Sequence, residues 1–199
     1  MPRARSLSLL LLLICFFVGC GKSANVARQE LVQMNIPYTE KDFLEAARQG
    51  NSTAVGLFID AGINVETRDG AGQTALMTAT LTNQLETVKV LLAKGADADA
   101  TDKYGGTALM TAAWKGNKEI ALVLLESGVA LNAKATNGMT ALMFAAWENH
   151  TDISRALLEK GADPELKDQN GWTAAMRADF KGHTEVVNIL KESPRHKGY

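Results

Sequence analysis

A period of 33 residues constrains this chain more than any other feature of its sequence. Four threonines recur at that spacing, and each lies two places after a glycine: Thr74, Thr107, Thr140 and Thr173. A second set of glycines recurs at the same spacing, just after a paired apolar run: Gly62, Gly95, Gly128 and Gly161. A period held over about 150 residues indicates a stack of one repeated supersecondary unit. The sequence therefore predicts a solenoid, an architecture typical of binding proteins.

Each unit of the period predicts two short helices. In residues 105–134, Thr107 begins a first helix, Gly116 and Asn117 interrupt it, and Glu119 begins a second helix with apolar residues at helical spacing. The polar stretch between successive units is too short for a further helix. We therefore expect a β-turn or hairpin loop there.

The order of residues within the unit resembles the ankyrin repeat. Gly-x-Thr-Ala-Leu-Met is followed by a Gly or Asn turn, Leu-Leu and Gly-Ala-Asp, most completely in residues 72–97 and again in residues 138–163. This resemblance covers residues 39–192. It implies an all-α fold, an ankyrin-repeat solenoid of about five helix-pair repeats of 33 residues with β-turn or hairpin loops. The proline and histidine of the family's Thr-Pro-Leu-His tetrapeptide are absent, because the chain has Thr-Ala-Leu-Met in three units.

The first and last units differ from the others as terminal caps do. Lys41 replaces the threonine in the first unit, and Asp179 and Lys191 replace apolar residues in the last. Polar substitutions on an outer face keep terminal repeats soluble. One methionine recurs in four units, and we expect all four to fill gaps in the core: Met77, Met110, Met143 and Met176.

The first 20 residues are typical of an export signal. Arg3 and Arg5 precede an apolar run over residues 7–18, which is shorter than the roughly 20 residues of a bilayer span. The end of this run, Phe17-Val18-Gly19-Cys20, resembles the lipobox of bacterial lipoproteins. That resemblance implies lipidation of Cys20 and attachment to a membrane. Ordinary cleavage near Gly19, or an uncleaved leader, is the alternative.

These features divide the chain into four parts: a signal peptide with a lipobox-like end (1–20), a linker with a possible short helix (21–38), the ankyrin-repeat domain (39–192) and a flexible tail (193–199). The leader predicts a location in the cell envelope, lipid-anchored and facing the periplasm. A soluble periplasmic or secreted protein is the alternative. Both cysteines, Cys15 and Cys20, lie in the leader, so the repeats can form neither a disulfide nor a thiolate metal site.

No group of residues in the repeats predicts chemistry. The net charge is -1, without the basic stripe that nucleic acid requires. Asp97, Asp99 and Asp102 match a calcium loop only in part. His150 and His183 stand one period apart before second helices, where a structural role is expected. We therefore expect a non-enzymatic protein without a cofactor, a metal or a nucleic-acid partner.

The ankyrin resemblance implies that a partner contacts the concave side, which is formed by the hairpin tips and the exposed first-helix positions. These positions are rich in large apolar side chains: Leu81, Trp114, Trp147 and Phe180 on first helices, Tyr104, Met139 and Trp172 at hairpin tips, with Lys115 and Glu148 on a polar rim. Aromatic anchors are typical energetic centres of protein interfaces. Alternatively, the rings pack against adjacent repeats and stiffen the stack, and both roles can hold together.

The sequence thus predicts a monomeric protein of the bacterial cell envelope that holds a protein partner in this groove, as an adaptor or a protective partner of a periplasmic protein. One alternative is an immunity-type inhibitor of a periplasmic toxin, which would occlude a single enzyme tightly. Another is a binder of a small ligand such as a lipid, haem or glycan, which would purify with its ligand bound.

Overall fold

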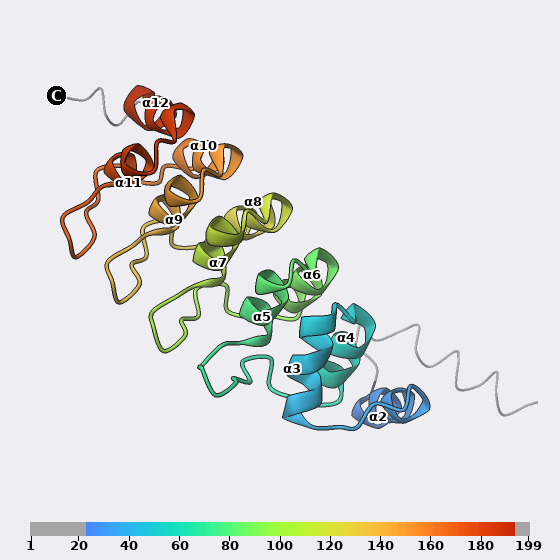
Figure 1. Cartoon of the computed structure of the whole chain (residues 1–199). Coiled ribbons are helices and arrows are strands. Elements are labelled where there is room, and N and C mark those ends of the chain that lie inside the picture. The colour runs from blue at the N-terminus through green and yellow to red at the C-terminus, as the bar shows by residue number, and fades with distance from the viewer. Residues whose placement is uncertain (1–22, 194–199) are drawn as a thin grey trace, which may run out of the picture.

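The computed structural model describes residues 23–193, and within that range it contains eleven helices and no strand (Figure 1). The helices are α2 (Ala24–Gln33), α3 (Glu40–Gln49), α4 (Ser52–Asp60), α5 (Ala75–Leu81), α6 (Leu85–Ala93), α7 (Ala108–Lys115), α8 (Lys118–Glu126), α9 (Ala141–Trp147), α10 (Thr151–Glu159), α11 (Ala174–Phe180) and α12 (Thr184–Glu192). None of these described helices has the length and apolar character needed to cross a membrane. The predicted signal peptide, Cys20 and the tail beyond residue 193 lie outside the described residues.

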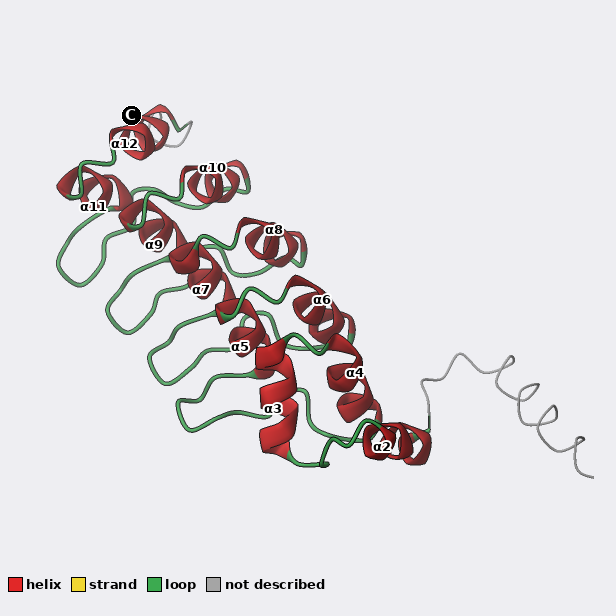
Figure 2. Ribbon diagram, turned by 45° about the vertical axis from the view of Figure 1, so that its right-hand side comes forward, coloured by secondary structure: helices red, strands yellow, loops and turns green. Residues whose placement is uncertain are grey.

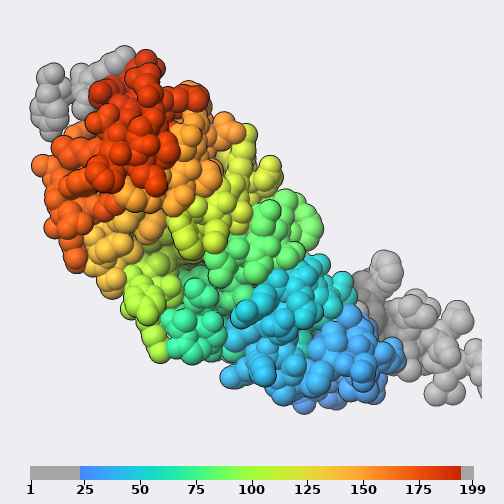
Figure 3. All heavy atoms as spheres, in the orientation of Figure 1, coloured from blue at the N-terminus to red at the C-terminus, as the bar shows by residue number. Residues whose placement is uncertain are grey.

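Ten of these helices form five pairs that follow one another along an elongated body (Figures 1 and 3). The first helix of each pair lies in one row and the second helix lies in another (Figure 2). The first row contains α3, α5, α7, α9 and α11, and the second row contains α4, α6, α8, α10 and α12. Loops between successive pairs project from the same side, next to the row of first helices. The predicted all-α solenoid of five helix pairs is therefore confirmed.

A threonine hydroxyl caps the N-terminus of every first helix. The hydroxyl oxygen accepts a hydrogen bond from the backbone N–H three residues later, at 3.1–3.4 Å, in all five repeats: Thr39, Thr74, Thr107, Thr140 and Thr173. Such a cap satisfies a backbone donor that has no partner within the helix, and it contributes about 1 kcal/mol. From Thr74 onward, the 33-residue period of threonine is thus the period at which first helices begin.

The core runs between the two rows of helices. Leu76, Leu109 and Leu142 of the first helices are buried in it. Met77, Met110 and Met143 are also buried, as expected, but the prediction for Met176 is wrong because 52% of this residue is exposed. A following first helix packs against each of the helices that carry the other three methionines, whereas no further pair follows α11 and α12 in the described range.

Helix α2 covers the outer end of the first repeat, in the segment where a linker with a possible short helix was expected. Its apolar residues Ala27 and Leu31 are fully buried, and α2 packs against α4. Arg28 donates a hydrogen bond to the carbonyl of Ala61, which also accepts one from the Tyr38 hydroxyl. The first helix pair therefore does not expose an uncovered apolar face at this end.

Four hairpin loops connect the pairs, and each has the same turn. In the loop before α7, for example, the N–H of Asp102 donates to the carbonyl of Gly106, and the N–H of Gly105 donates to the carbonyl of Asp102. Successive tips are joined by one backbone hydrogen bond, such as that from Thr136 to the carbonyl of Tyr104 at 2.8 Å. The loops therefore form a continuous layer beside the first helices.

Two glycines at the same place in successive hairpins provide a test of this layer. Gly138 and Gly171 have φ of 80° and 78°, but a Cβ at Gly138 would lie 2.7 Å from the backbone nitrogen of Gln169, whereas one at Gly171 would meet nothing within 4 Å. We expect Gly171→Ala to cost about 1–2 kcal/mol, the strain of a left-handed alanine. Gly138→Ala should cost about 1–3 kcal/mol more, because a neighbouring backbone must move.

Urea unfolding followed by circular dichroism measures both values. Equal costs for the two variants would show that adjacent hairpin tips are not in close contact.

Candidate functional site

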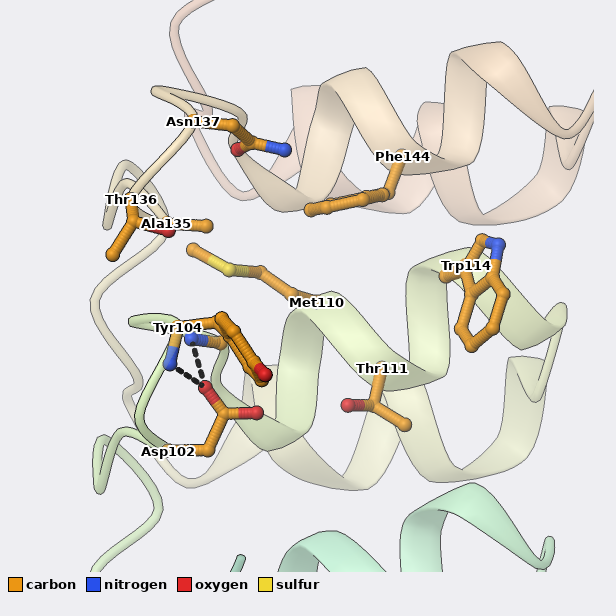
Figure 4. Close-up of a pocket in the computed structure, with 10 residues that line it drawn as sticks. Asp102, Tyr104, Met110, Thr111, Trp114, Ala135, Thr136, Asn137 and Phe144 are labelled. Atoms are coloured by element: carbon orange, nitrogen blue, oxygen red, sulfur yellow. Dashed lines mark hydrogen bonds between the residues drawn. The ribbon is translucent and has the colours of Figure 1, made fainter. Parts of the chain in front are cut away.

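We define the hairpin face as the surface made by the hairpin tips and the exposed side of the first helices. A cavity of about 330 Å³ opens on this face between the third and fourth repeats. Its walls are mainly apolar and come from one hairpin tip on each side and from α7 and α9: Asp102, Tyr104, Gly106, Met110, Thr111, Trp114, Ala135, Thr136, Asn137 and Phe144 (Figure 4). The site therefore depends on two repeats packing side by side.

Tyr104 stands at the tip of the third hairpin with 70% of its surface exposed. Its backbone is fixed on both sides, because its N–H donates to Oδ1 of Asp102 at 2.8 Å and its carbonyl accepts the N–H of Thr136. An exposed tyrosine on a fixed backbone offers a large contact area at a small cost in conformational entropy.

Trp114 lies in the last turn of α7 on the opposite side of the cavity and is 45% exposed. Its backbone carbonyl lies 3.3 Å from Nε2 of His150, a distance at which a protonated Nε2 donates a hydrogen bond. His183 makes the same contact with the carbonyl of Trp147 at 3.1 Å. Both histidines thus have the structural role predicted for them, and each joins one repeat to the end of the first helix of the preceding repeat.

The other aromatic residues predicted on the hairpin face form a second cluster at the C-terminal end of the stack. Trp147 and Phe180 are stacked with ring centroids 6.1 Å apart, and Trp172 meets Phe180 edge-on at 5.2 Å. Both tryptophans are half-buried, while Phe180 is exposed. These rings contact one another, although Phe180 is still 67% exposed, whereas no other ring in the described range stacks on Tyr104 or Trp114.

Arg177 of α11 holds the second cluster together. Its guanidinium lies 5.4 Å from the ring centroid of Trp147 and 5.9 Å from that of Trp172. It also forms an ion pair with Asp168, whose side chain is fully buried, including a hydrogen bond from Nε to Oδ2 of 2.8 Å. The cation therefore links the hairpin to the aromatic rings.

Burial of Asp168 raises the pKa of its carboxyl. Hydrogen bonds from the backbone N–H of Trp172, from the Arg177 guanidinium and from the backbone N–H of Asn170 outweigh burial, so the pKa lies below its ordinary value of 3.8. A lowered folded-state pKa means that the ionised carboxylate stabilises the fold above about pH 4. This contribution is lost as the pH falls through the lowered pKa.

The predicted contact residues outside the aromatic groups are exposed, with one exception. Leu81, Lys115 and Glu148 are exposed as expected. Met139 is a correction: it was expected on the surface of a hairpin tip, but it is only 6% exposed and belongs to the core. Its position follows the turn, where the chain returns toward the first helix, so its side chain packs inward. Of the predicted contact residues, Tyr104 and Trp114 border the cavity, while Trp147, Trp172 and Phe180 form the aromatic cluster.

The sequence identified Tyr104 and Trp114 as site residues but missed the other residues of the cavity wall, among them Asp102, Thr111 and Phe144. The available signal was variation at one register position, which holds threonine in the second and third repeats, Phe144 in the fourth and Arg177 in the fifth. A position whose residue type differs between repeats, while the residues around it stay the same, is not needed for the packing that the repeats share. Among the described residues, no cluster of three or more His, Cys, Asp or Glu is arranged to hold a metal ion.

Comparison with known proteins identifies the repeat. A family model described as "Ankyrin repeats (3 copies)" matches residues 43–135 and 127–198. The chain is also similar to a putative ankyrin repeat-containing protein of Treponema pallidum (strain Nichols), with 36% identity over 73 residues. That alignment covers 37% of this chain and 24% of the relative, so this chain matches only a minor part of the relative's length.

Arg177→Gln tests the strength of the buried ion pair. We expect a loss of about 3 kcal/mol at neutral pH, because the variant leaves a buried carboxylate with only its backbone donors. Arg48→Gln is the matched control, since Arg48 forms an exposed pair with Glu45, and it should cost less than about 0.5 kcal/mol. Urea unfolding at pH 7 measures both.

Acidification adds a second comparison. The difference in unfolding free energy between the wild type and Arg177→Gln should narrow as the pH falls through the lowered pKa of Asp168, because both proteins then come to carry a neutral carboxyl. A difference that stays constant between pH 7 and pH 2 would contradict a role of the ion pair.

Proposed function

The chain belongs to the ankyrin-repeat family, a general protein-interaction module, and from that premise we propose that it is a non-enzymatic protein that holds a protein partner against its hairpin face. The proposal includes a location in the bacterial cell envelope, with the chain acting as an adaptor or a protective partner of a periplasmic protein. Its support comes from the family, from the surface chemistry of the hairpin face and from the sequence of the leader.

The observation that carries the proposal is the open aromatic cavity between the third and fourth repeats. Tyr104 and Trp114 expose much of their surface beside it, although similar rings at the C-terminal end pack against one another. A soluble domain that leaves large apolar side chains around a depression gains free energy when another surface covers them. Tyrosine and tryptophan in such pockets are enriched among the residues that dominate binding energy.

The polar rim expected on the hairpin face lies outside the cavity wall. Lys115 and Glu148 follow Trp114 and Trp147 at the ends of α7 and α9, and both are exposed. Charged groups around an apolar centre affect the rate of association and the choice of partner more than the affinity. Such a rim with an aromatic centre is typical of protein interfaces.

An immunity-type inhibitor of a periplasmic toxin would use the same face. It differs in affinity and stoichiometry, because it would occlude one enzyme tightly, whereas an adaptor binds more weakly. A small-ligand binder is the other alternative. The cavity of about 330 Å³ is at the lower end of the 300–1,000 Å³ range of ligand pockets and is open to solvent, which favours a side chain of a partner over a lipid or haem.

Replacing both concave tryptophans tests the protein-binding function. Trp114→Ala/Trp147→Ala should lose at least about nine-tenths of the partner recovered by crosslinking in intact cells, since removing one interface anchor commonly costs 2 kcal/mol or more, roughly 30-fold in affinity. The helical circular dichroism should persist. Leu122→Ala is the matched control, because Leu122 is an exposed apolar residue on α8, in the row of second helices. An undiminished yield of the same partner from the double variant would rule out the hairpin face.

The envelope location is tested at Cys20. The lipobox-like end of the leader leads us to expect that Cys20→Ser abolishes incorporation of radioactive palmitate and moves the protein from the membrane fraction to the soluble fraction. Cys15→Ser is the control, because it removes the other cysteine of the leader. Unchanged labelling of the Cys20 variant would show that this residue is not the site of lipidation.

A further inference from the structure

Asp102 contributes the one charged side chain among the described residues that line the cavity. Its Oδ1 accepts hydrogen bonds from the backbone N–H groups of Tyr104 and Gly106, both at 2.8 Å. No donor in the described range contacts its second oxygen, Oδ2. Figure 4 shows this oxygen directed away from the hairpin backbone, toward the side on which Thr111 lies.

The fifth repeat shows what an aspartate in this position can bind. Asp168 lies two periods after Asp102 and accepts the same pair of backbone hydrogen bonds, from Asn170 and Trp172. Its Oδ2 accepts a further hydrogen bond from Nε of Arg177, whose guanidinium also lies over two aromatic rings. The hairpin aspartate thus has one oxygen for the loop and one oxygen for a guanidinium.

In the third repeat the residue in the register of Arg177 is Thr111. Its side chain is too short to supply a cation to Asp102. The fourth repeat supports the pairing of the two positions, since it has Ala135 in place of the aspartate and Phe144 in place of the arginine. A charge is therefore absent from both positions in the fourth repeat and present at both in the fifth, whereas the second and third repeats have only the aspartate.

The other unpaired hairpin aspartate, Asp69, is in a different setting. The cavity beside it is lined by the chain's own basic residues Lys41 and Arg48. Arg48 precedes Asp69 in the sequence by the same number of residues as Leu81 precedes Asp102. The position that holds a cation beside Asp69 therefore holds a leucine beside Asp102. Within residues 23–193, Asp102 is thus the hairpin aspartate whose cavity has no basic side chain in its wall.

Nearby lysines are engaged elsewhere. The ammonium of Lys103 donates to the carbonyl of Gly70 at 2.6 Å, on the preceding hairpin. The ammonium of Lys115 lies 4.0 Å from the ring centroid of Trp114, but Lys115 does not line the cavity. Neither lysine therefore neutralises the carboxylate from within the cavity.

Building on the proposed function, we propose that the protein partner inserts an arginine side chain into this cavity, where its guanidinium binds Oδ2 of Asp102 between the rings of Tyr104 and Trp114. A planar guanidinium pairs with a carboxylate and stacks on an aromatic ring at the same time, which an ammonium does less well. Met110 and Phe144 offer apolar surface to its methylene groups. Asp102 and Thr111 then set the specificity for a partner with an exposed arginine.

The first test uses two blocked tripeptides, acetyl-Ala-Arg-Ala-amide and the same peptide with citrulline, which keeps the shape and removes the charge. Each is titrated into the full-length chain in detergent, and the indole N–H resonances of Trp114 and Trp172 are followed by NMR. We expect the arginine peptide to shift the Trp114 resonance alone and to bind at least about tenfold more tightly than the citrulline peptide. Equal binding of both peptides, or no shift of Trp114 up to the solubility limit, would overturn the proposal.

Two variants locate the binding. Asp102→Asn keeps an oxygen for the hairpin hydrogen bonds, and it should weaken arginine-peptide binding by about tenfold or more while leaving citrulline-peptide binding unchanged. Thr111→Arg supplies an internal guanidinium by analogy with Arg177, so it should block the arginine peptide. Asp69→Asn is the matched control and should bind as the wild type does. Wild-type binding by either of the first two variants would refute the assignment.

Crosslinking in intact cells separates this inference from the function on which it rests. Full recovery of the partner with Asp102→Asn, together with loss in Trp114→Ala/Trp147→Ala, would refute the arginine anchor and leave the binding face intact. Full recovery with both variants would refute the binding face itself. Loss in both, with recovery in Asp69→Asn, is the result we expect.

Discussion

Close packing of one first helix against the next is the contact on which the rest of the structure depends. An alanine at the same register is fully buried in four successive first helices, at Ala79, Ala112, Ala145 and Ala178, and the small side chain allows the helices to approach closely. These helices have only seven or eight residues, a length at which an isolated helix is unstable in water. Each repeat therefore folds because its neighbour is present, and the hairpin tips, threonine caps and histidine contacts are aligned by the same stacking.

This dependence also places the candidate site. Because packing fixes the buried register positions, the positions that can vary lie at the hairpin tips and on the exposed side of the first helices. In the fifth repeat the variable residues satisfy one another, with Arg177 bound to Asp168 and flanked by Trp147 and Trp172. In the third repeat Thr111 holds the register of Arg177, and an open cavity lies beside Tyr104 and Trp114. One scaffold thus uses the same positions for stability in one repeat and for exposed surface in another.

The sequence predicted the architecture well, because the repeated residues have local causes. Threonine recurs where a helix begins, and five helix pairs were expected and found. The structural role of His150 and His183 could also be predicted, since their register is one at which a side chain contacts the preceding repeat. Met139 was expected on the surface but is buried, because it follows the turn where the chain returns toward the first helix. Met176 was expected in the core but is exposed, because no further repeat in the described range packs against α11.

The amino-acid sequence alone determined the period, the helix pairs and the row of large residues on one side of the stack, since each follows from spacing along the chain. Only the tertiary structure decided which of those residues are available to a partner. Trp114 and Trp147 have the same register and the same type, yet Phe180, Arg177 and Lys181 surround the second indole, while the first borders an open cavity. That difference arises between repeats, where side chains from separate parts of the chain meet, and spacing within one repeat carries no information about it.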